Sequence, residues 1–234
     1  KKSITPSVPF TLVVAMLEPL VNSKLDIDAL LQRSGCQYSH QHLLQSTGRI
    51  SRVTFVRLLE EVWATLEDES GGFIDKGLPI GTFAMMNRAA ITCHNLKSAL
   101  YCSQQFISML TNELTLDLQI QQNRGYFIVD YSNSTFQEGF FIPAIILLWV
   151  RWASWLTDKA LSLEAIHFCF DKPDFADVLF YDFSCPVLFN QQLNQLLIKK
   201  DVLALPIVQN VRTMPNYLAN CPSNIAIPYR HDES

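Results

Sequence analysis

The side chains able to act as nucleophiles, acids or bases are scattered along the sequence rather than gathered in a motif. Cys93 and His94 form an adjacent thiol–imidazole pair, but sequence neighbours point apart on a helix, so a nucleophile–base dyad is not expected. There is no G-x-S-x-G motif, glycine-rich phosphate loop, H-E-x-x-H motif or carboxylate pair on one helix face. We therefore predict no catalytic residues and no enzymatic activity; a small enzyme with an unrecognised site is kept as a remote alternative.

The cysteine and histidine spacing also argues against a metal site. Cys36, His40 and His42 lie close together, but their spacing matches no standard zinc pattern. The 6 cysteines include no C-x-x-C pair, which is typical of reduced thiols in a cytoplasmic protein rather than of a disulfide framework. We therefore predict no metal, no cofactor and a cytoplasmic location.

The charge balance excludes a direct role in nucleic-acid binding for this chain. The formal net charge is −4. The densest basic cluster is Arg49, Arg52 and Arg57, and Glu60 and Glu61 follow it directly, which is typical of a solvated helix face.

One apolar segment, Gly139 to Val150, has to be considered as a membrane span. It contains Pro143, ends at Arg151 and is shorter than the roughly 20 apolar residues that a span requires. We therefore expect a buried core helix and no membrane association. We expect Arg151 itself, and the similarly isolated Arg88, to lie exposed at a helix edge.

The first part of the chain, about residues 7–112, has the periodicity and capping residues of helices. Pro9 marks a helix start, and Pro19 is expected to kink or end that helix early. Asp26, Ser51 and Asn95 each stand at an N-cap position before an apolar stripe with helical spacing. A further helix is expected near residues 83–93.

Near residue 113 the apolar period changes from 3.6 to 2, which predicts strands. Two strands joined at Asn123-Arg124-Gly125 should form a hairpin, followed by a long apolar helix from about Thr135 to Leu161. The remaining expected elements are strands at 165–170, 186–189 and 194–198 and helices at 174–183 and 209–220. The fold class is therefore α+β: an N-terminal helical half packed on a small ββαβαβ-like mixed sheet with a long central apolar helix.

Aromatic residues gather around that apolar helix. Aromatic and apolar walls with a few polar groups suit a small-molecule pocket, although plain core packing also explains them. The residues concerned are Tyr126, Phe127, Tyr131, Phe136, Phe140, Phe141, Trp149, Trp152 and Trp155.

The order of several motifs resembles a known family. These motifs are Leu25-Asp26-Ile27-Asp28-Ala29-Leu30-Leu31 ending at Gly35, the Ser51-capped helix, Gly77 and Gly81, Asn95-Leu96-x-x-Ala99-Leu100, Phe183-Ser184-Cys185-Pro186-Val187-x-Phe189-Asn190, and Leu203-x-x-Pro206. From about Pro9 to Leu218 the chain is similar to the N-terminal effector-binding, arabinose-binding-domain-like domain of bacterial AraC-type transcriptional regulators.

The resemblance implies a domain that binds a small-molecule effector, forms a homodimer and controls a C-terminal helix-turn-helix domain that contacts DNA. Residues 1–224 would form the effector-binding and dimerisation domain, with an α+β part at about 113–220. Residues 225–234 would begin the linker to a DNA-binding domain that is expected to be missing from this chain.

For the effector, we expect a site between the apolar helix and the sheet. Tyr126, Phe140, Trp149 and Trp152 are predicted as its walls, and the polar anchors are predicted to be Arg88 and His167. The alternative is an interaction module that dimerises without any ligand, with the apolar helix as its contact face.

Overall fold

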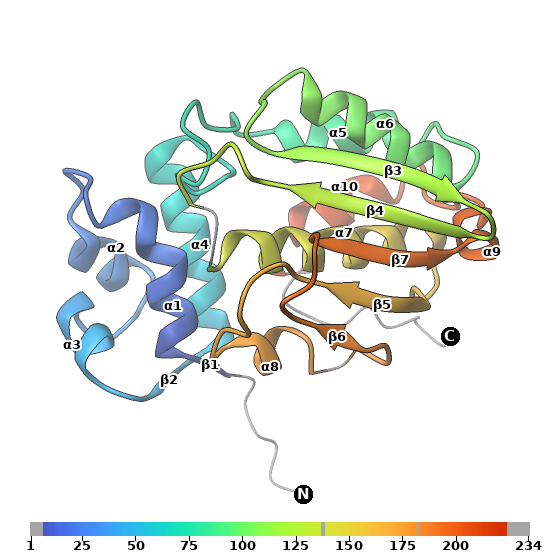
Figure 1. Ribbon diagram of the computed structural model, residues 1–234. Helices are drawn as coiled ribbons and strands as arrows, with labels where there is room; N and C mark the ends of the chain where they lie inside the picture. The colour runs from blue at the N-terminus through green and yellow to red at the C-terminus, as the bar shows by residue number, and fades with distance from the viewer. Residues whose placement is uncertain (1–6, 137–138, 182, 224–234) are drawn as a thin grey trace, which may run out of the picture.

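The computed structural model of this chain describes residues 7–136, 139–181 and 183–223, so the expected linker at 225–234 lies outside the described residues. Helices dominate the first part of the chain, and the second part adds a sheet with further helices (Figure 1). This arrangement confirms the α+β class.

The predicted N-caps are present. The side chains of Asp26, Ser51 and Asn95 each accept a hydrogen bond from a backbone N–H, at 3.0, 3.0 and 2.9 Å. They satisfy donors that a helix start otherwise leaves without partners. The helices that follow are α2 (Ile27–Arg33), α4 (Arg52–Leu66) and α6 (Leu96–Ser108).

The first helix ends early, as the proline predicts. Helix α1 (Phe10–Leu17) stops before Pro19, and the chain continues as the 3-10 turn η1 (Glu18–Leu20). Two features were not expected from the sequence pattern: α3 (His40–Gln45) and the antiparallel pair of β1 (Ser7–Pro9) and β2 (Arg49–Ser51). These short elements pack beside α1 and α4.

The expected hairpin consists of β3 (Thr115–Gln121) and β4 (Arg124–Asp130). Within the described ranges these join a five-stranded sheet of order β3-β4-β7-β5-β6. Strands β5 and β6 pair in parallel and the other neighbours are antiparallel, so the sheet is mixed as predicted. The other three strands are β5 (Leu163–His167), β6 (Val187–Leu188) and β7 (Gln195–Lys199).

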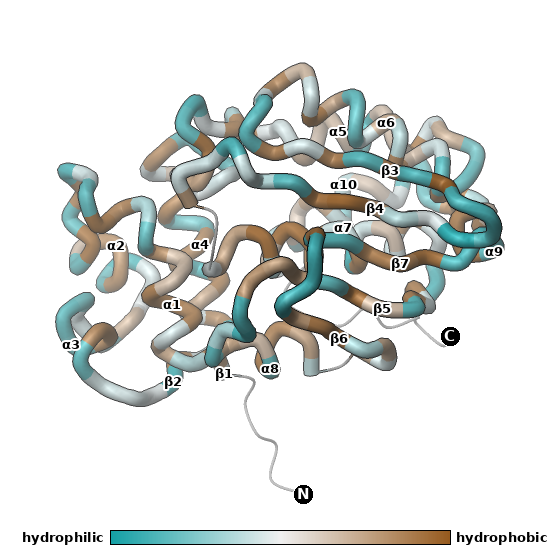
Figure 2. The backbone as a smooth tube through the Cα atoms, in the orientation of Figure 1, coloured by the Kyte–Doolittle hydropathy of each residue, from teal (hydrophilic) through white to brown (hydrophobic). Residues whose placement is uncertain are grey.

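Helix α7 (Phe141–Thr157) lies behind the sheet and is buried along most of its length (Figures 1 and 2). The predicted range, Thr135 to Leu161, was too long at both ends. Gly139 and Asp158 have positive φ angles of 104° and 52°, a backbone conformation that does not continue a right-handed helix. Because neighbouring elements already cover α7, it does not offer an open contact face. Among the helices of the described residues, none combines the length and hydropathy needed to cross a membrane.

The expectation for Arg151 was wrong, whereas Arg88 is exposed as predicted. Arg151 is 9% exposed, and its guanidinium lies 5.2 Å from the centre of the Phe183 ring. A guanidinium over an aromatic face keeps a favourable electrostatic contact when it leaves water. The contact with the Phe183 ring therefore helps to explain why this arginine can be buried in apolar surroundings.

Helices cover one face of the sheet, and the other face is open (Figure 1). The covering layer contains α7, α6, α5 (Thr82–Ala90) and α10 (Met214–Ala219). Two other helices, α8 (Ala176–Leu179) and α9 (Lys200–Leu203), are short. The helices expected at 83–93, 174–183 and 209–220 correspond to α5, α8 and α10, each shorter than predicted. Buried apolar residues of the helical part and the sheet form one core cluster from Val8 to Tyr217.

Candidate ligand-binding site

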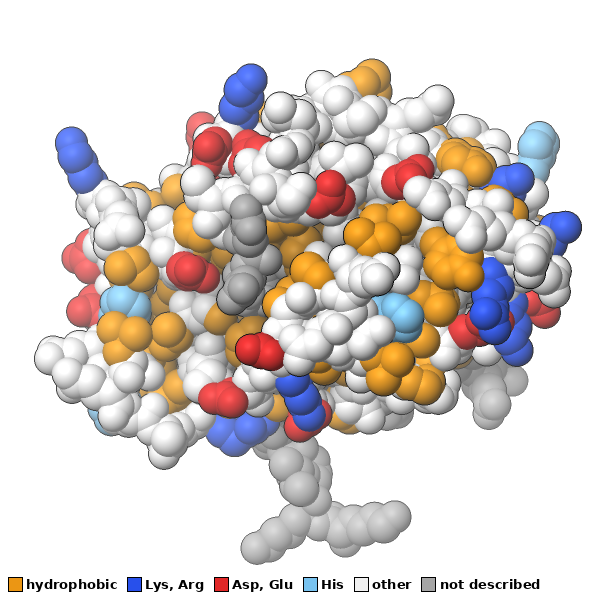
Figure 3. Space-filling view, viewed as in Figure 1, with side chains coloured by type: hydrophobic (Ala, Val, Ile, Leu, Met, Phe, Trp, Pro, Cys, Tyr) orange, Lys and Arg blue, Asp and Glu red, His pale blue; other side chains and the backbone are white. Residues whose placement is uncertain are grey.

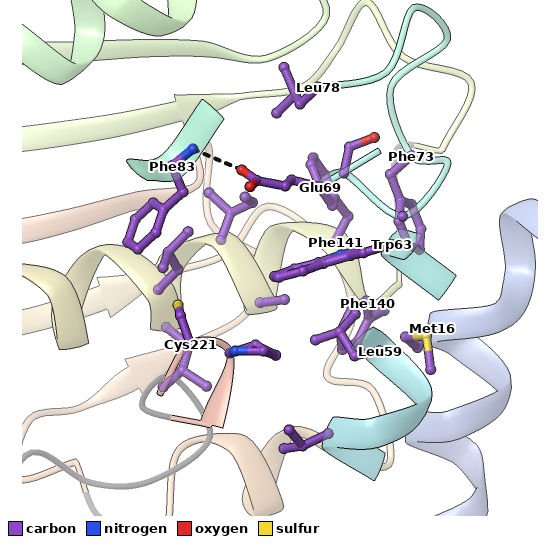
Figure 4. Close-up of a pocket in the computed structure, with 18 of the residues that line it drawn as sticks. Met16, Leu59, Trp63, Glu69, Phe73, Leu78, Phe83, Phe140, Phe141 and Cys221 are labelled. Atoms are coloured by element: carbon purple, nitrogen blue, oxygen red, sulfur yellow. Dashed lines mark hydrogen bonds between the residues drawn. The ribbon is translucent and has the colours of Figure 1, made fainter. Parts of the chain in front are cut away.

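A cavity of about 370 Å³ lies between the N-terminal helices and α7. In Figure 4, Phe141 of α7 lies near its centre. Met16 of α1 and Trp63 of α4 lie on one side, and Phe83 of α5 and Cys221, which follows α10, lie on the other. The cavity is therefore built by segments that are far apart in the sequence.

Helix α4 contributes one continuous stripe to the wall. Arg52, Val56, Leu59 and Trp63 recur at intervals of three or four residues, which places them on the same side of a helix. The opposite side of α4 is polar and solvated, as at the exposed Arg57. The half-buried Arg52, Leu59 and Trp63 therefore lie at the edge of the buried face of α4, where they border the cavity.

An aromatic group forms the wall where α7 begins. Phe73 stacks on Phe141 with ring centres 5.1 Å apart and planes at 14°, and it also contacts Phe140 at 5.9 Å. Phe55 of α4 meets Phe140 edge-on at 6.3 Å. These contacts fix the rings because stacked and edge-on arrangements are the favoured geometries of aromatic pairs.

The loop between α4 and α5 is organised by the buried carboxylate of Asp68. It accepts hydrogen bonds from the backbone N–H groups of Ser70, Gly72 and Leu78 at 2.7, 2.9 and 2.6 Å. The Ser70 hydroxyl donates a fourth at 2.6 Å. Ser70, Leu78 and the intervening Phe73 line the cavity, so Asp68 holds this part of the wall in place.

Glu69 caps the start of α5 from a distance in the sequence. Its two carboxylate oxygens accept hydrogen bonds from the N–H groups of Gly81 and Phe83, at 2.7 and 2.8 Å. Figure 4 shows the bond from Phe83. A carboxylate at a helix N-terminus satisfies free N–H groups and interacts favourably with the helix dipole. Gly81 provides no capping side chain itself and has a φ angle of 97°.

Cys221 lies on the same wall and is held as a neutral thiol. Burial, and then the negative charge of Glu69, raise the pKa of Cys221 to about 12. Because the thiolate is the nucleophilic form, this cysteine is unreactive near neutral pH. It contributes a small apolar surface to the cavity.

Comparison with known families identifies the domain. A family model described as the arabinose-binding domain of AraC transcription regulator, N-term, matches residues 25–207. The chain belongs to this family. No curated protein matches the chain. The match places the chain among regulatory, ligand-sensing domains of the AraC type rather than in an enzyme family.

Two of the predicted site residues line the cavity of this AraC-type domain, Phe140 and Trp149. The Trp149 ring packs edge-on against Phe127 of β4 at 5.7 Å and against Trp152 at 4.9 Å. Its buried indole N–H has no hydrogen-bond partner among the residues that the structure describes.

Trp152 and Arg88 lie elsewhere. Trp152 is fully buried, and its indole N–H donates to the side-chain oxygen of Asn87 at 2.9 Å. Arg88 follows Asn87 on α5 but is exposed. Neither side chain lines the cavity.

Tyr126 and His167 lie on the open face of the sheet, opposite to α7. The β4–β7–β5 register places Tyr126 beside Leu197, and His167 beside Gln195, whose amide lies 3.2 Å from the His167 ring. Burial lowers the pKa of His167. The six predicted residues therefore do not form a single site in this structure.

The residues considered for metal binding have other contacts. The ring of His42 stacks on Tyr38 at 5.0 Å, and the Cys36 thiol lies 3.7 Å from the Tyr38 carbonyl oxygen. Across the described ranges there is no group of three or more side chains placed to hold a metal ion.

Sequence reasoning missed most of the wall because the same pattern predicts core packing. Phe55 and Leu59 belong to the apolar stripe that follows the N-cap Ser51, and nothing in the sequence distinguishes a stripe that lines a void from one that fills it. One signal was available: Glu69 precedes the glycines of the loop after α4, and the helix that follows the loop, α5, lacks a capping side chain of its own.

Proposed function

We propose that this domain senses a small-molecule effector that binds in the cavity between α4, α7 and the segment after α10. The observation that carries the proposal is the position of the cavity between separate parts of the fold. Met16 belongs to the first helix, and Cys221 lies near the end of the described chain. A ligand here would contact both segments and would therefore change the stability of the packing between them.

The effector must bind one arrangement of the domain more tightly than another, because a ligand with equal affinity for both shifts nothing. We propose that the bound arrangement stabilises the packing of Leu218 and Cys221 against α7. In regulators of this type that segment would lead toward a helix-turn-helix domain, so a change in its packing would alter DNA binding. The regulator would act in the cytoplasm, without a cofactor or membrane.

We also propose that the domain pairs with a second copy. The open face of the sheet supports this because it carries apolar side chains in adjacent strands (Figure 3). Ile128 and Leu197 are half-buried there, and Leu188 is 42% exposed.

The dimer proposal is tested by analytical ultracentrifugation. Sedimentation of the wild type should show a concentration-dependent dimer, and Leu197→Glu should weaken it. Val211→Glu, at a site that is 72% exposed, is the control; equal behaviour of the two variants would exclude this face.

The sensing proposal is tested by filling the cavity. Ala144 lines it, and Ala144→Phe would place a ring in the void. Ala64→Phe adds the same ring to the exposed side of α4 and serves as the matched control. The probe is anilinonaphthalene sulfonate, an apolar dye that fluoresces in apolar pockets.

We expect the dye to bind the wild type and Ala64→Phe with similar affinity and Ala144→Phe at least about tenfold more weakly, because overlap with the new ring costs more than 1.4 kcal/mol. Thermal unfolding would verify that both variants are folded. Equal dye binding by the two folded variants would contradict the proposed site.

A further inference from the structure

The cavity wall provides few free hydrogen-bonding groups. The Ser70 hydroxyl donates to Asp68 at 2.6 Å, and the Thr82 hydroxyl donates to the Pro79 carbonyl at 2.7 Å. Both oxygens of Glu69 already accept backbone N–H groups. The other described lining side chains able to form hydrogen bonds are Arg52, Trp63, Trp149, Tyr181 and Cys221.

Such a wall does not suit a sugar. A sugar has a hydroxyl on nearly every carbon, and each hydroxyl that leaves water needs a new partner or costs free energy. The wall instead presents aliphatic and aromatic carbon from α1, α4 and α7. The part of the ligand that lies in this cavity is therefore apolar, even though the family is named for arabinose.

The two charged groups of the described wall differ in how well they are satisfied. Glu69, the carboxylate, is held by two N–H groups at the start of α5. Arg52, the cation, is half-buried in the first turn of α4, and its side chain forms no ion pair or hydrogen bond with the residues that the structure describes. The N-terminal end of α4 adds positive potential beside it.

We propose that the effector is an apolar monocarboxylate whose carboxylate pairs with Arg52 and whose hydrocarbon body lies along Leu59 and Phe141. This inference rests on the proposed function and names its ligand class. A guanidinium matches a carboxylate through two parallel N–H···O bonds. A single arginine beside an apolar wall compensates one negative charge, whereas a phosphate dianion would need further donors.

The test compares an acid with its neutral analogue. Isothermal titration measures the affinity of octanoate, octanol and L-arabinose for the wild type and for Arg52→Gln. The matched control is Arg57→Gln, on the same helix but exposed and away from the cavity. Octanol retains the hydrocarbon body, so it separates cavity occupancy from recognition of the charge.

We expect octanoate to bind the wild type and Arg57→Gln equally, and Arg52→Gln about tenfold to a hundredfold more weakly, as for loss of a hydrogen bond to a charged group. Octanol should bind all three proteins with the same, weaker affinity, and arabinose should not bind. Equal affinity of octanoate and octanol, insensitive to Arg52→Gln, would overturn the carboxylate assignment while leaving the sensing cavity intact. Binding of arabinose in place of octanoate would also overturn it. Octanol affinity that is unaffected by Ala144→Phe would instead count against the cavity itself.

Discussion

Replacement of Asp68 by alanine tests whether one buried carboxylate holds the cavity wall. In the native fold its oxygens accept three backbone N–H groups and one hydroxyl, at distances of 2.6–2.9 Å. Asp68→Ala leaves these donors without an acceptor in a region where Ser70 and Leu78 are buried. A buried donor without a partner costs about 1–3 kcal/mol, and water that enters the gap recovers part of it. We therefore expect a loss of about 3–5 kcal/mol in the free energy of unfolding.

Urea denaturation, followed by tryptophan fluorescence, measures that loss. The control is Asp75→Ala, which removes an exposed carboxylate from the same loop and should change stability by less than about 0.5 kcal/mol. Asp68→Ala should also weaken dye binding in its folded form, because the loop that carries Phe73 and Leu78 is no longer fixed. A change below 1 kcal/mol for Asp68→Ala, with dye binding intact, would refute the role assigned to this residue.

Three other predictions concern the elements that support the cavity. Trp152→Phe removes the indole N–H that donates to Asn87 and leaves a small void. Calorimetry should therefore show a loss of about 2–4 kcal/mol in the free energy of unfolding. A loss below 1 kcal/mol would contradict the importance of this hydrogen bond. Ser51→Ala removes the N-cap of α4 and should cost about 1 kcal/mol in urea denaturation, whereas Ser51→Asp should retain most of the wild-type stability; equal losses would argue against a capping effect. Burial lowers the pKa of His167, so as the pH falls below about 6.5 the unfolded chain binds a proton before the folded chain does. The free energy of unfolding should therefore decrease on acidification through this range, and less steeply in His167→Asn; an identical pH dependence would contradict this assignment.

The helix starts and the β3–β4 hairpin could be predicted from the sequence because they depend on local chemistry. Asp26, Ser51 and Asn95 act within three residues of their own positions, and the alternation in β3 decides which side of the strand is buried. The ends of α7 were harder to predict. Its apolar pattern extends beyond the helix, and the left-handed conformations of Gly139 and Asp158 depend on the surrounding fold.

The lining of the candidate cavity could be predicted only in part because a cavity is a property of the tertiary structure. Phe140 and Trp149 were recognised as aromatic residues near an apolar helix, and they line the cavity. Tyr126 and His167 were grouped with them, but strand alternation directs these two toward the opposite face of the sheet. The positions of Arg52 and Glu69 on the cavity wall depend on how distant segments pack together, which residue spacing does not reveal.

The most direct test of the cavity as the effector site is nuclear magnetic resonance of the tryptophan indole N–H groups during titration with octanoate. Trp63 and Trp149 line the cavity, whereas the Trp152 indole is held by Asn87 in the core. We predict that the Trp63 and Trp149 signals shift in a saturable way and that the Trp152 signal remains near its original position. Saturating octanoate that leaves the Trp63 and Trp149 signals unmoved would contradict the account.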